Sequence, residues 1–441
     1  MNAENVLKRV RDEKIRFVSL WFTDVLGSLK SFVITADELE TALHEGMGFD
    51  GSSIEGYARI EESDMIARPD PSTFVLLPWH ATCDAPMARM FCDILEPSGA
   101  PYEGDPRGAL KRNLKKAADL GYVFNVGPEL EYFYFKNDRP RPQPLDKGGY
   151  FDLTPLDVAS DLRRDTVLAL EAMGIHAEYS HHEVAPSQHE IDLRYTDALT
   201  MADAAMTYRL AVKEVAMQHG VYATFMPKPI FGENGSGMHV HQSLFKGDEN
   251  AFFDPHGEFH LSGVGKAYIA GLLRHAREMC CVVAQWVNSY KRLVPGYEAP
   301  VYLTWGRRNR SALVRVPMYK PGKAKATRAE FRCPDPACNP YLAFSVMLAA
   351  GLRGIEEGYE LCAPVEEDIF EMSPEERRQR GIESLPGNLA EAIAETQRSE
   401  LVREALGDHI FEKFLASKVI EWDRYRTHVS HYELERYLPI L

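Results

Sequence analysis

The sequence predicts an α+β protein of two domains, a small N-terminal one and a larger one built on a largely antiparallel sheet. Three observations predict this class. The chain has 441 residues, which exceeds one ordinary hydrophobic core. Its 45% hydrophobic and 26% charged residues are typical of a globular protein. Segments with the alternation of strands follow segments with the periodicity of helices, and no internal repeat is found.

The N-terminal domain is predicted from a short amphipathic helix followed by two strands and a second helix. Strand patterning covers residues 15–21 and 29–34, and turn residues separate the two runs. Thr35 is placed to cap a helix that extends to about His44. These elements predict a small α+β unit.

The boundary between the domains is predicted in the Pro/Gly-rich loop 97–106, which divides the chain into domains 1–104 and 105–441. Pro340 stands where a helix would begin after Asn339. The larger domain is then predicted to contain helices over 107–120, 158–173, 340–358 and 389–422, and strands over 127–135, 178–184 and 189–195.

Composition excludes several classes of protein. A formal net charge of -15 disfavours a nucleic-acid binder, which needs a concentrated basic face. The seven cysteines are an odd number and Cys280 and Cys281 are adjacent, so neither a disulfide framework nor a CxxC zinc site is indicated. Neither a signal peptide nor an uninterrupted apolar run of membrane-spanning length is found. We therefore expect a cytoplasmic protein that binds neither nucleic acid nor membrane.

Two pairs of carboxylates are the most informative feature of the chain. Glu129 and Glu131 are two residues apart on a predicted strand, so they share one face. Glu183 and Glu190 flank the loop 185–188, and a hairpin closed on that loop would set them opposite each other. Carboxylates in that position repel, so either this register is wrong or a cation lies between them, and we favour the cation. A lone Glu-x-Glu strand is more often an exposed edge, but two such pairs make that reading weaker.

A glycine-rich segment is the candidate phosphate site, because the chain has no Walker A sequence and no GxGxxG that opens a helix. In residues 228–243 the glycines allow backbone amides to approach phosphate. The strand that follows projects His239 and His241 to one side. The alternative is an ordinary structural loop.

A group of arginines completes the pattern: Arg292, Arg310, Arg315 and Arg332. Guanidinium groups bind carboxylates and phosphates through paired hydrogen bonds, although a single arginine is more often part of a surface ion pair. Glu330 lies two residues before Arg332 and shares its face on a strand. Together these residues suit phosphoryl transfer, with oxygen ligands that favour two Mg²⁺ or Mn²⁺ ions over zinc.

With these motifs in order, the chain resembles type I glutamine synthetases over essentially its whole length. Residues 49–64, Phe-Asp-Gly-Ser-Ser-Ile-Glu-Gly-Tyr-Ala-Arg-Ile-Glu-Glu-Ser-Asp, resemble the N-terminal signature of the family, and 228–243 its ATP signature. The resemblance implies a β-grasp-like N-terminal domain and a catalytic domain. It also implies a dodecamer of two hexameric rings with active sites between subunits. The implied reaction is ATP-dependent ligation of ammonia to the γ-carboxylate of glutamate through γ-glutamyl phosphate.

The resemblance also implies a role for each matching residue. The first metal ion would be bound by Glu131, Glu183 and Glu190, and the second by Glu129, His239 and Glu330. Glutamate would be bound by Asn234, Gly235, Arg292 and Arg332. ATP would be bound by Glu178, Tyr195, His241, Ser243, Arg310 and Arg315. Ammonium would be bound and deprotonated by Asp50 with Ser53 and Tyr150, and Glu298 would close as a flap that excludes water.

Four positions either differ from the family pattern or indicate which subclass the chain resembles. Phe370 stands where the adenylylated tyrosine of longer family members is expected, so we predict no such control. Arg59 fits the position of a feedback-inhibition arginine in the shorter, non-adenylylated subclass. Gly306 and Arg307 replace an expected Ser-Ala.

Two rival functions remain. One is a ligase that joins an amine or polyamine to the γ-carboxylate of glutamate on the same scaffold; retention of Asp50, Ser53, Tyr150 and Glu298 favours ammonia. The other is a catalytically silent sensor that binds glutamine, and the complete set of carboxylates argues against it.

Overall fold

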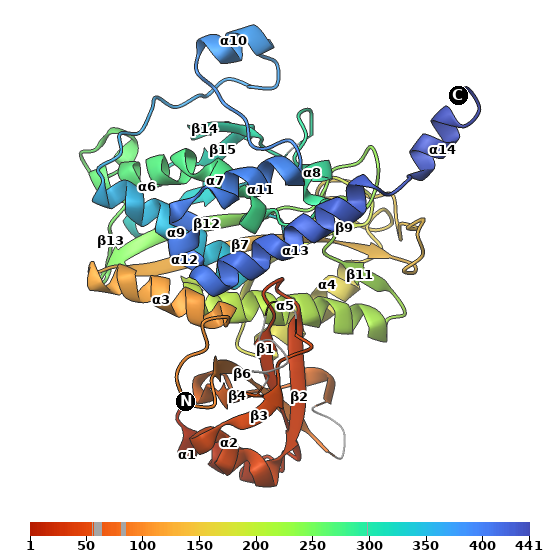
Figure 1. Ribbon diagram of the computed structural model, residues 1–441, viewed down its shortest axis with the longest axis vertical. Coiled ribbons are helices and arrows are strands. Elements are labelled where there is room, and N and C mark those ends of the chain that lie inside the picture. The colour runs from red at the N-terminus through yellow and green to blue at the C-terminus, as the bar shows by residue number, and fades with distance from the viewer. Residues whose placement is uncertain (55, 57–63, 81–84, 298) are drawn as a thin grey trace.

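The computed structural model describes residues 1–54, 56, 64–80, 85–297 and 299–441. Two β-sheets, each with its own hydrophobic core, are stacked along the long axis of the molecule (Figure 1). Helices α3 (Pro106–Asp119) and α5 (Ala198–Gln218) lie between them. The C-terminal helix α14 (His431–Tyr437) extends away from the body.

The N-terminal sheet has the strand order β2-β1-β6-β4-β3, with β5 also paired to β6. Only β1 and β6 of its described strands run parallel. Helix α1 buries Val6 and Val10 in the core of this sheet. The elements are α1 (Ala3–Asp12), β1 (Phe17–Thr23), β2 (Leu29–Thr35), α2 (Leu39–Glu45), β3 (Met47–Asp50), β4 (Asp64–Pro69), β5 (Val75–Leu76) and β6 (Met87–Leu95).

Both strands predicted in this part of the chain are present within two residues of their expected ends. The predicted cap at Thr35 is wrong. Its backbone is extended as at a helix start, but its side chain makes no capping hydrogen bond. A 3₁₀ turn, Ala36–Glu38, comes first, and α2 begins only at Leu39.

The second sheet has the order β14-β15-β16-β12-β7-β9-β8, with β10 and β11 on β7 and β13 on β12. Among the described strands only β14 and β15 pair in parallel, so the predicted antiparallel character is confirmed. The strands are β7 (Val123–Phe135), β8 (Ala177–His182), β9 (Gln188–Leu193), β10 (Thr196–Asp197), β11 (Tyr222–Thr224), β12 (Met238–Lys246), β13 (Glu249–Asn250), β14 (Tyr302–Gly306), β15 (Ala312–Arg315) and β16 (Ala329–Phe331).

Helices cover this sheet, and the predicted ones are found with small shifts at their ends. The predicted start at Pro340 is correct: Asn339 caps α9, and its side chain accepts a hydrogen bond from the Tyr341 amide at 3.0 Å. The segment 389–422 is three helices rather than one. The remaining helices are α4 (Ser160–Ala172), α6 (Gly263–Arg274), α7 (Ala276–Val283), α8 (Ser289–Arg292), α9 (Pro340–Glu356), α10 (Pro374–Gln379), α11 (Leu389–Gln397), α12 (Glu400–Leu406) and α13 (Asp408–Arg426).

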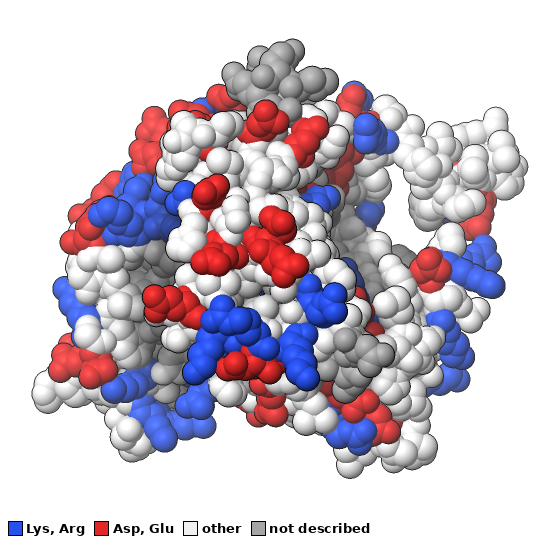
Figure 2. Space-filling model, turned by 90° about the horizontal axis from the view of Figure 1, so that it is seen from below, with Lys and Arg blue, Asp and Glu red and all other residues white. Residues whose placement is uncertain are grey.

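The surface of the N-terminal end carries charges of both signs. Figure 2 shows groups of Lys and Arg side chains lying beside groups of Asp and Glu on this face. Within the part of the chain that the structure describes, no helix is both long enough and apolar enough to cross a bilayer.

Candidate metal and phosphoryl-transfer site

Strand β7 carries the first carboxylate pair. Leu130 and Tyr132 are buried in the main core, and their alternation sends Glu129 and Glu131 to the opposite face of the sheet. The Leu130 carbonyl between the two glutamates accepts a 3.0 Å hydrogen bond from the Tyr208 hydroxyl of α5. The core therefore holds the backbone on which both carboxylates stand.

Strand β12 brings both predicted histidines to Glu129. His239 is opposite Glu129 in the antiparallel register, and its Nδ1 lies 3.3 Å from Glu129 Oε2. His241, two residues on, lies with Nε2 2.6 Å from Glu129 Oε1. Burial would raise the pKa of Glu129, but the hydrogen bonds from both histidines hold it below its usual range. Burial and the charge of Arg332 lower the pKa of His239 to about 4, so this imidazole is neutral and available as a ligand at neutral pH.

Glu330 of β16 completes this first cluster. It is fully buried, pairs opposite His241 and lies 3.7 Å from His239 Nδ1. Arg332 Nη1 donates to Glu330 Oε1 at 2.6 Å, and Arg315 Nε donates to its other oxygen. Burial would raise the pKa of Glu330, but the Arg332 charge lowers it to about 2, so the carboxylate is ionised.

The second cluster forms where β7, β9 and the end of β8 meet. Glu131 is directly opposite Glu190, and Glu131 Oε2 accepts hydrogen bonds from Gln188 Nε2 at 2.7 Å and the Gly237 amide at 3.0 Å. Ligand atoms of His181, Glu183 and Glu190 lie within 4.8 Å of one another.

The predicted register of the β8–β9 hairpin is wrong by two residues. Glu190 is opposite His181, and Glu183 falls opposite Gln188, to whose carbonyl its amide donates at 2.8 Å. Side chains alternate with a period of two, so this shift leaves Glu183 and Glu190 on one face, set diagonally instead of face to face. His181 Nε2 lies between them, 2.8 Å from Glu183 Oε1 and 3.7 Å from Glu190 Oε2.

The charges of these carboxylates fit a divalent cation. Burial, followed by the charge of Glu183, raises the pKa of Glu131 well above its usual range. Burial and the charge of Asp192 do the same for Glu190. These two groups therefore lack a positive partner strong enough to keep them ionised. Carboxylate oxygen donors such as these are the ligands of hard ions such as Mg²⁺ or Mn²⁺.

A small cavity of about 30 Å³ adjoins both clusters, with space for about two water molecules. Its wall contains Glu131, Glu183, Gln188, Asn234, Gly235, His239, Arg292, Tyr297 and Ala299. Arg292 is 2% exposed and is held by the Cys333 and Arg332 carbonyls at 2.8 and 3.1 Å. Gly237 allows this packing, because a Cβ there would lie 2.7 Å from Arg292 Nη2 and 2.9 Å from His239 Nε2.

A second cavity, of about 230 Å³, is bordered by Glu129. Its wall brings together four residues predicted for ATP: Glu178, Tyr195, His241 and Ser243. The size and polarity of this space suit part of a nucleotide.

A third, open cavity of about 700 Å³ contains Arg310 with Asn234, Tyr297 and Phe370. Tyr150 lies at the nearby second cluster, with its ring 5.4 Å from that of His181. Burial and the charge of Glu183 raise the pKa of Tyr150, so its hydroxyl keeps its proton.

The unexpected Gly306–Arg307 pair has a local structural reason. A Cβ at Gly306 would lie 2.7 Å from the Val365 carbonyl oxygen, so a glycine fits where a serine would collide. Arg307 turns toward the surface, with its guanidinium 4.1 Å from the Phe259 ring centroid and its Nε 3.3 Å from Glu366.

Not every predicted residue joins this site within one chain. The described residues that line the three cavities all come from the segment 125–370, whereas Asp50 and Ser53 lie at the end of β3 and just after it. Both are exposed, and Asp50 Oδ1 accepts a hydrogen bond from the Ser52 amide at 2.8 Å. Arg59 and Glu298 lie outside the described residues.

Sequence reasoning missed several residues of the nucleotide-sized cavity. Lys325, Arg328, Tyr179 and Asp192 also line it, and Arg328 Nε lies 3.1 Å from His241 Nδ1. The only signal for the first two was a basic stretch ahead of Glu330, which most often marks a solvated loop.

Models of the same protein family match both the N-terminal and the C-terminal part of the chain. The model of the glutamine synthetase beta-Grasp domain matches residues 14–97, and that of the glutamine synthetase catalytic domain matches residues 103–437. The glutamine synthetase of Mycolicibacterium smegmatis is 56% identical over 442 residues, covering 99% of each chain. That of Methanosarcina mazei is 52% identical, covering 99% of this chain and 98% of its own.

Solved structures share the fold of this chain over almost its whole length. A GmaS–ADP complex superposes with a TM-score of 0.90 at 31% identity and covers 98% of this chain and 99% of its own. The cryo-EM structure of Plasmodium falciparum glutamine synthetase gives a TM-score of 0.87 at 26% identity, with 99% of both chains covered.

Proposed function

This chain belongs to the glutamine synthetase family, and we propose that the two carboxylate clusters and the arginines beside them carry out its reaction. The reaction is the ATP-dependent ligation of ammonia to glutamate, which forms glutamine, ADP and phosphate. One observation supports the assignment most strongly. Five carboxylates and three histidines gather at one part of the sheet, beside the buried guanidinium groups of Arg292 and Arg332.

The family uses divalent metal ions with ATP, and we assign two of them to this site. Glu131, Glu183 and Glu190 hold one, and Glu129, His239 and Glu330 hold the other. Mg²⁺ or Mn²⁺ suits these ligands, and such ions neutralise phosphate charge during transfer.

The first chemical step joins glutamate to phosphate. Arg292 and Arg332 attract the carboxylates of glutamate, and Asn234 and Gly235 border the cavity in which glutamate binds. A γ-carboxylate oxygen attacks the γ-phosphorus of ATP, the bond to the bridging oxygen breaks, and ADP leaves with the electron pair. Arg310 and Arg315 stabilise the charge that spreads over the transferring oxygens.

The nucleotide occupies the cavity of about 230 Å³. Glu178 and Tyr195 border it, Ser243 and His241 lie along its β12 wall, and Arg328 adds a charge suited to phosphate. Glu129 borders this cavity and belongs to a metal cluster, which sets the phosphates beside the ions.

The second step needs ammonia near γ-glutamyl phosphate. Asp50, with Ser53 and Tyr150, binds ammonium and takes a proton from it. The nitrogen then attacks the acyl carbon and phosphate leaves. Asp50 belongs to the N-terminal sheet and is not among the described residues that line the three cavities above, which supports assigning it to the site of a neighbouring subunit. A dodecamer of two hexameric rings provides such neighbours. Glu298 closes over the intermediate and excludes water.

The remaining assignments concern regulation and context. Phe370 has no hydroxyl to adenylylate, which supports the short, non-adenylylated subclass, and Arg59 is its feedback-inhibition residue. The six described cysteines are free thiols, which suits the reducing cytoplasm. We keep the division into domains 1–104 and 105–441, and matched regions that end at residue 97 and begin at residue 103 support it.

The test is phosphate release from ATP with Mg²⁺ and glutamate, in which ammonium is compared with methylamine, putrescine and spermine. We expect ammonium-dependent release with an equal amount of glutamine. Glu131→Gln should abolish release, because it removes a metal ligand. A preference for an amine would contradict ammonia as the substrate, and an unaffected Glu131→Gln would contradict the assigned site.

A further inference from the structure

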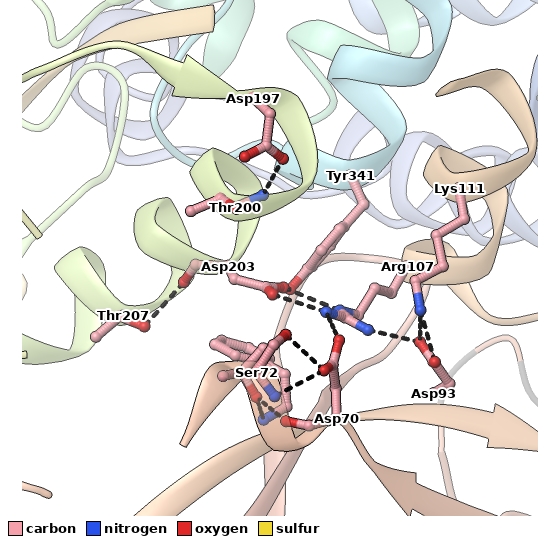
Figure 3. A network of polar contacts seen from close by, with 12 residues as sticks. Asp70, Ser72, Asp93, Arg107, Lys111, Asp197, Thr200, Asp203, Thr207 and Tyr341 are labelled. Atoms are coloured by element: carbon pink, nitrogen blue, oxygen red, sulfur yellow. Dashed lines mark hydrogen bonds and ion pairs between the residues drawn. The ribbon is translucent and has the colours of Figure 1, made fainter. Parts of the chain in front are cut away.

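Arg107, the second residue of α3, lies at the centre of a buried ion cluster (Figure 3). Its Nη1 lies 2.6 Å from Asp93 Oδ1, and its Nη2 lies 2.8 Å from Asp70 Oδ2. The same guanidinium faces Asp203 with two bonds, Nε to Oδ1 at 3.1 Å and Nη2 to Oδ2 at 3.0 Å. The Arg107 side chain is only 3% exposed, so these contacts are poorly screened by solvent.

The three carboxylates come from both sides of the junction between the sheets. Asp70 directly follows β4 and Asp93 lies on β6, so both belong to the N-terminal sheet. Asp203 lies on α5, beneath the second sheet, and the Tyr341 hydroxyl of α9 donates to it at 2.5 Å. The planar guanidinium group of Arg107 has several N–H donors in fixed directions, so it can bind three carboxylates at once. The ammonium group of a lysine cannot reproduce this geometry.

The helix that anchors this cluster also supports the metal site. Along α5, Asp203 faces Arg107, and Thr207 Oγ1 lies 3.2 Å from the buried Arg89 Nη2 of β6. One residue further, Tyr208 donates to the Leu130 carbonyl between Glu129 and Glu131. Helix α5 therefore contacts the N-terminal sheet and the carboxylate strand through neighbouring residues.

Strand β4 connects the Arg107 cluster to Asp50, so a rotation at one end of the strand moves the other end. Asp50 is paired opposite Asp64 at the start of β4, and Asp70 follows the other end. At about 3.3 Å per residue the two ends are about 20 Å apart, so a tilt of about 5° at the cluster displaces the far end by about 2 Å. Displacements of this size at a reacting group strongly reduce reaction rates.

We propose that Arg107 is a positioning residue for the ammonia step. By holding Asp70 and Asp93 against Asp203, it fixes the angle at which this chain presents Asp50 to the active site of a second copy of the chain. The inference rests on the proposed role of Asp50 across the subunit boundary. Arg107 touches no substrate, so its loss acts on the ammonium KM and leaves the glutamate and ATP sites intact.

The experiment uses the assembled enzyme with Arg107→Lys, which keeps the charge and loses the fork. We expect the KM for ammonium to rise about tenfold, while the KM values for glutamate and ATP change less than twofold. Asp70→Asn weakens a single arm of the cluster and should give a smaller change in the same direction. Arg164→Lys is the matched control, since Arg164 makes only exposed ion pairs on α4, and it should change nothing. Light scattering confirms that each variant is assembled.

Mixed oligomers provide a readout that a general loss of stability would not move. Glu131→Gln chains have defective catalytic sites but an intact Arg107 cluster, so they can present Asp50 correctly to Arg107→Lys chains. Co-expression of the two should restore a low ammonium KM at the sites of the Arg107→Lys chains.

Three outcomes would overturn the proposal: an unchanged ammonium KM in assembled Arg107→Lys, an equal rise in all three KM values, or no restoration in mixed oligomers. If Arg107→Lys does not assemble, Asp70→Asn decides by the same criteria. The variant Asp50→Asn distinguishes a failure of the positioning role of Arg107 from a failure of the ammonium-binding role of Asp50. If Asp50→Asn leaves the ammonium KM unchanged, the role of Asp50 fails; if it raises that KM while the cluster variants do not, only the inference about Arg107 fails.

Discussion

The carboxylate of Glu330 and the guanidinium of Arg332 lie 2.6 Å apart where water is almost excluded, since Glu330 is fully buried and Arg332 is 6% exposed. Their spacing of two residues sets both on one side of the chain at β16. Arg315 contacts the other carboxylate oxygen. Two cations therefore keep Glu330 ionised beside Glu129, which adds a negative charge to the candidate metal cluster of Glu129, His239 and Glu330.

Glu330→Gln should weaken the binding of Mn²⁺ by tenfold or more and lower the free energy of unfolding by about 3 kcal/mol. It removes a ligand charge and leaves Arg315 and Arg332 buried without their anion. Calorimetric titration with Mn²⁺ and thermal unfolding measure the two effects. Asp119→Asn is the control, because its partner Lys115 is 75% exposed and such pairs contribute little. Binding of Mn²⁺ at the wild-type affinity would contradict the assignment of Glu330.

Gly237→Ala should abolish glutamine synthesis in a protein that still folds. The added methyl group would collide with Arg292 Nη2 and His239 Nε2, which displaces a candidate glutamate ligand and a candidate metal ligand together. Activity and circular dichroism test this. Gly263→Ala is the control, since nothing lies within 4 Å of its Cβ position. Normal synthesis by Gly237→Ala would show that the packing around this glycine is not needed.

Tyr208→Phe should destabilise the protein by about 1 to 3 kcal/mol, because the buried Leu130 carbonyl loses its donor. Its metal affinity should also fall, by about tenfold, because Leu130 lies between Glu129 and Glu131. Tyr102→Phe, which removes a hydroxyl that contacts His409 at 3.0 Å, should affect stability without affecting metal binding. Equal effects of both variants on Mn²⁺ affinity would exclude a special role for Tyr208.

Asp105→Asn should change the pH dependence of stability. Burial and then the charge of Asp93 raise the pKa of Asp105 to about 6 from 3.8, against the opposing charge of Arg107. The folded state therefore holds its proton longer than the unfolded state, and stability falls as the pH rises from about 4 to about 6. Asparagine stays neutral at every pH. The free energy of unfolding of the variant, relative to that of the wild type, should therefore rise by about 3 kcal/mol across this window and stay at that level at higher pH.

The measurement is the melting temperature of both proteins at pH values from 4.5 to 7.5. The introduced asparagine accepts one hydrogen bond in place of the two that Asp105 accepts from the Arg107 and Ile94 amides, which adds a loss that does not depend on pH. A difference between the proteins that stays flat with pH would show that Asp105 is ionised throughout.

Sequence reasoning reached the parts of the site that depend on local periodicity. The shared face of Glu129 and Glu131, the shared side of His239 and His241, and the pairing of Glu330 with Arg332 all follow from the period of two in a strand. Each of these predictions requires only that the segment has an extended backbone.

Contacts between segments that are distant in the sequence could not be predicted in this way. The position of Glu190 opposite Glu131 depends on how β9 pairs with β7, a strand distant in the sequence. Lys325 and Arg328 reach the nucleotide-sized cavity only because β16 pairs with β12. The cluster around Arg107 joins residues 70, 93 and 203, and no local pattern relates these positions.

Glu129 belongs to the candidate metal cluster that also contains His239 and Glu330, and it borders the nucleotide-sized cavity. A charge that binds on one side of this carboxylate changes the free energy of binding on the other. Thermodynamic reciprocity then requires that a divalent ion strengthen nucleotide binding by the same factor by which the nucleotide strengthens binding of the ion. One shared side chain thus makes the two affinities interdependent, and neither has a single value unless the concentration of the other ligand is stated.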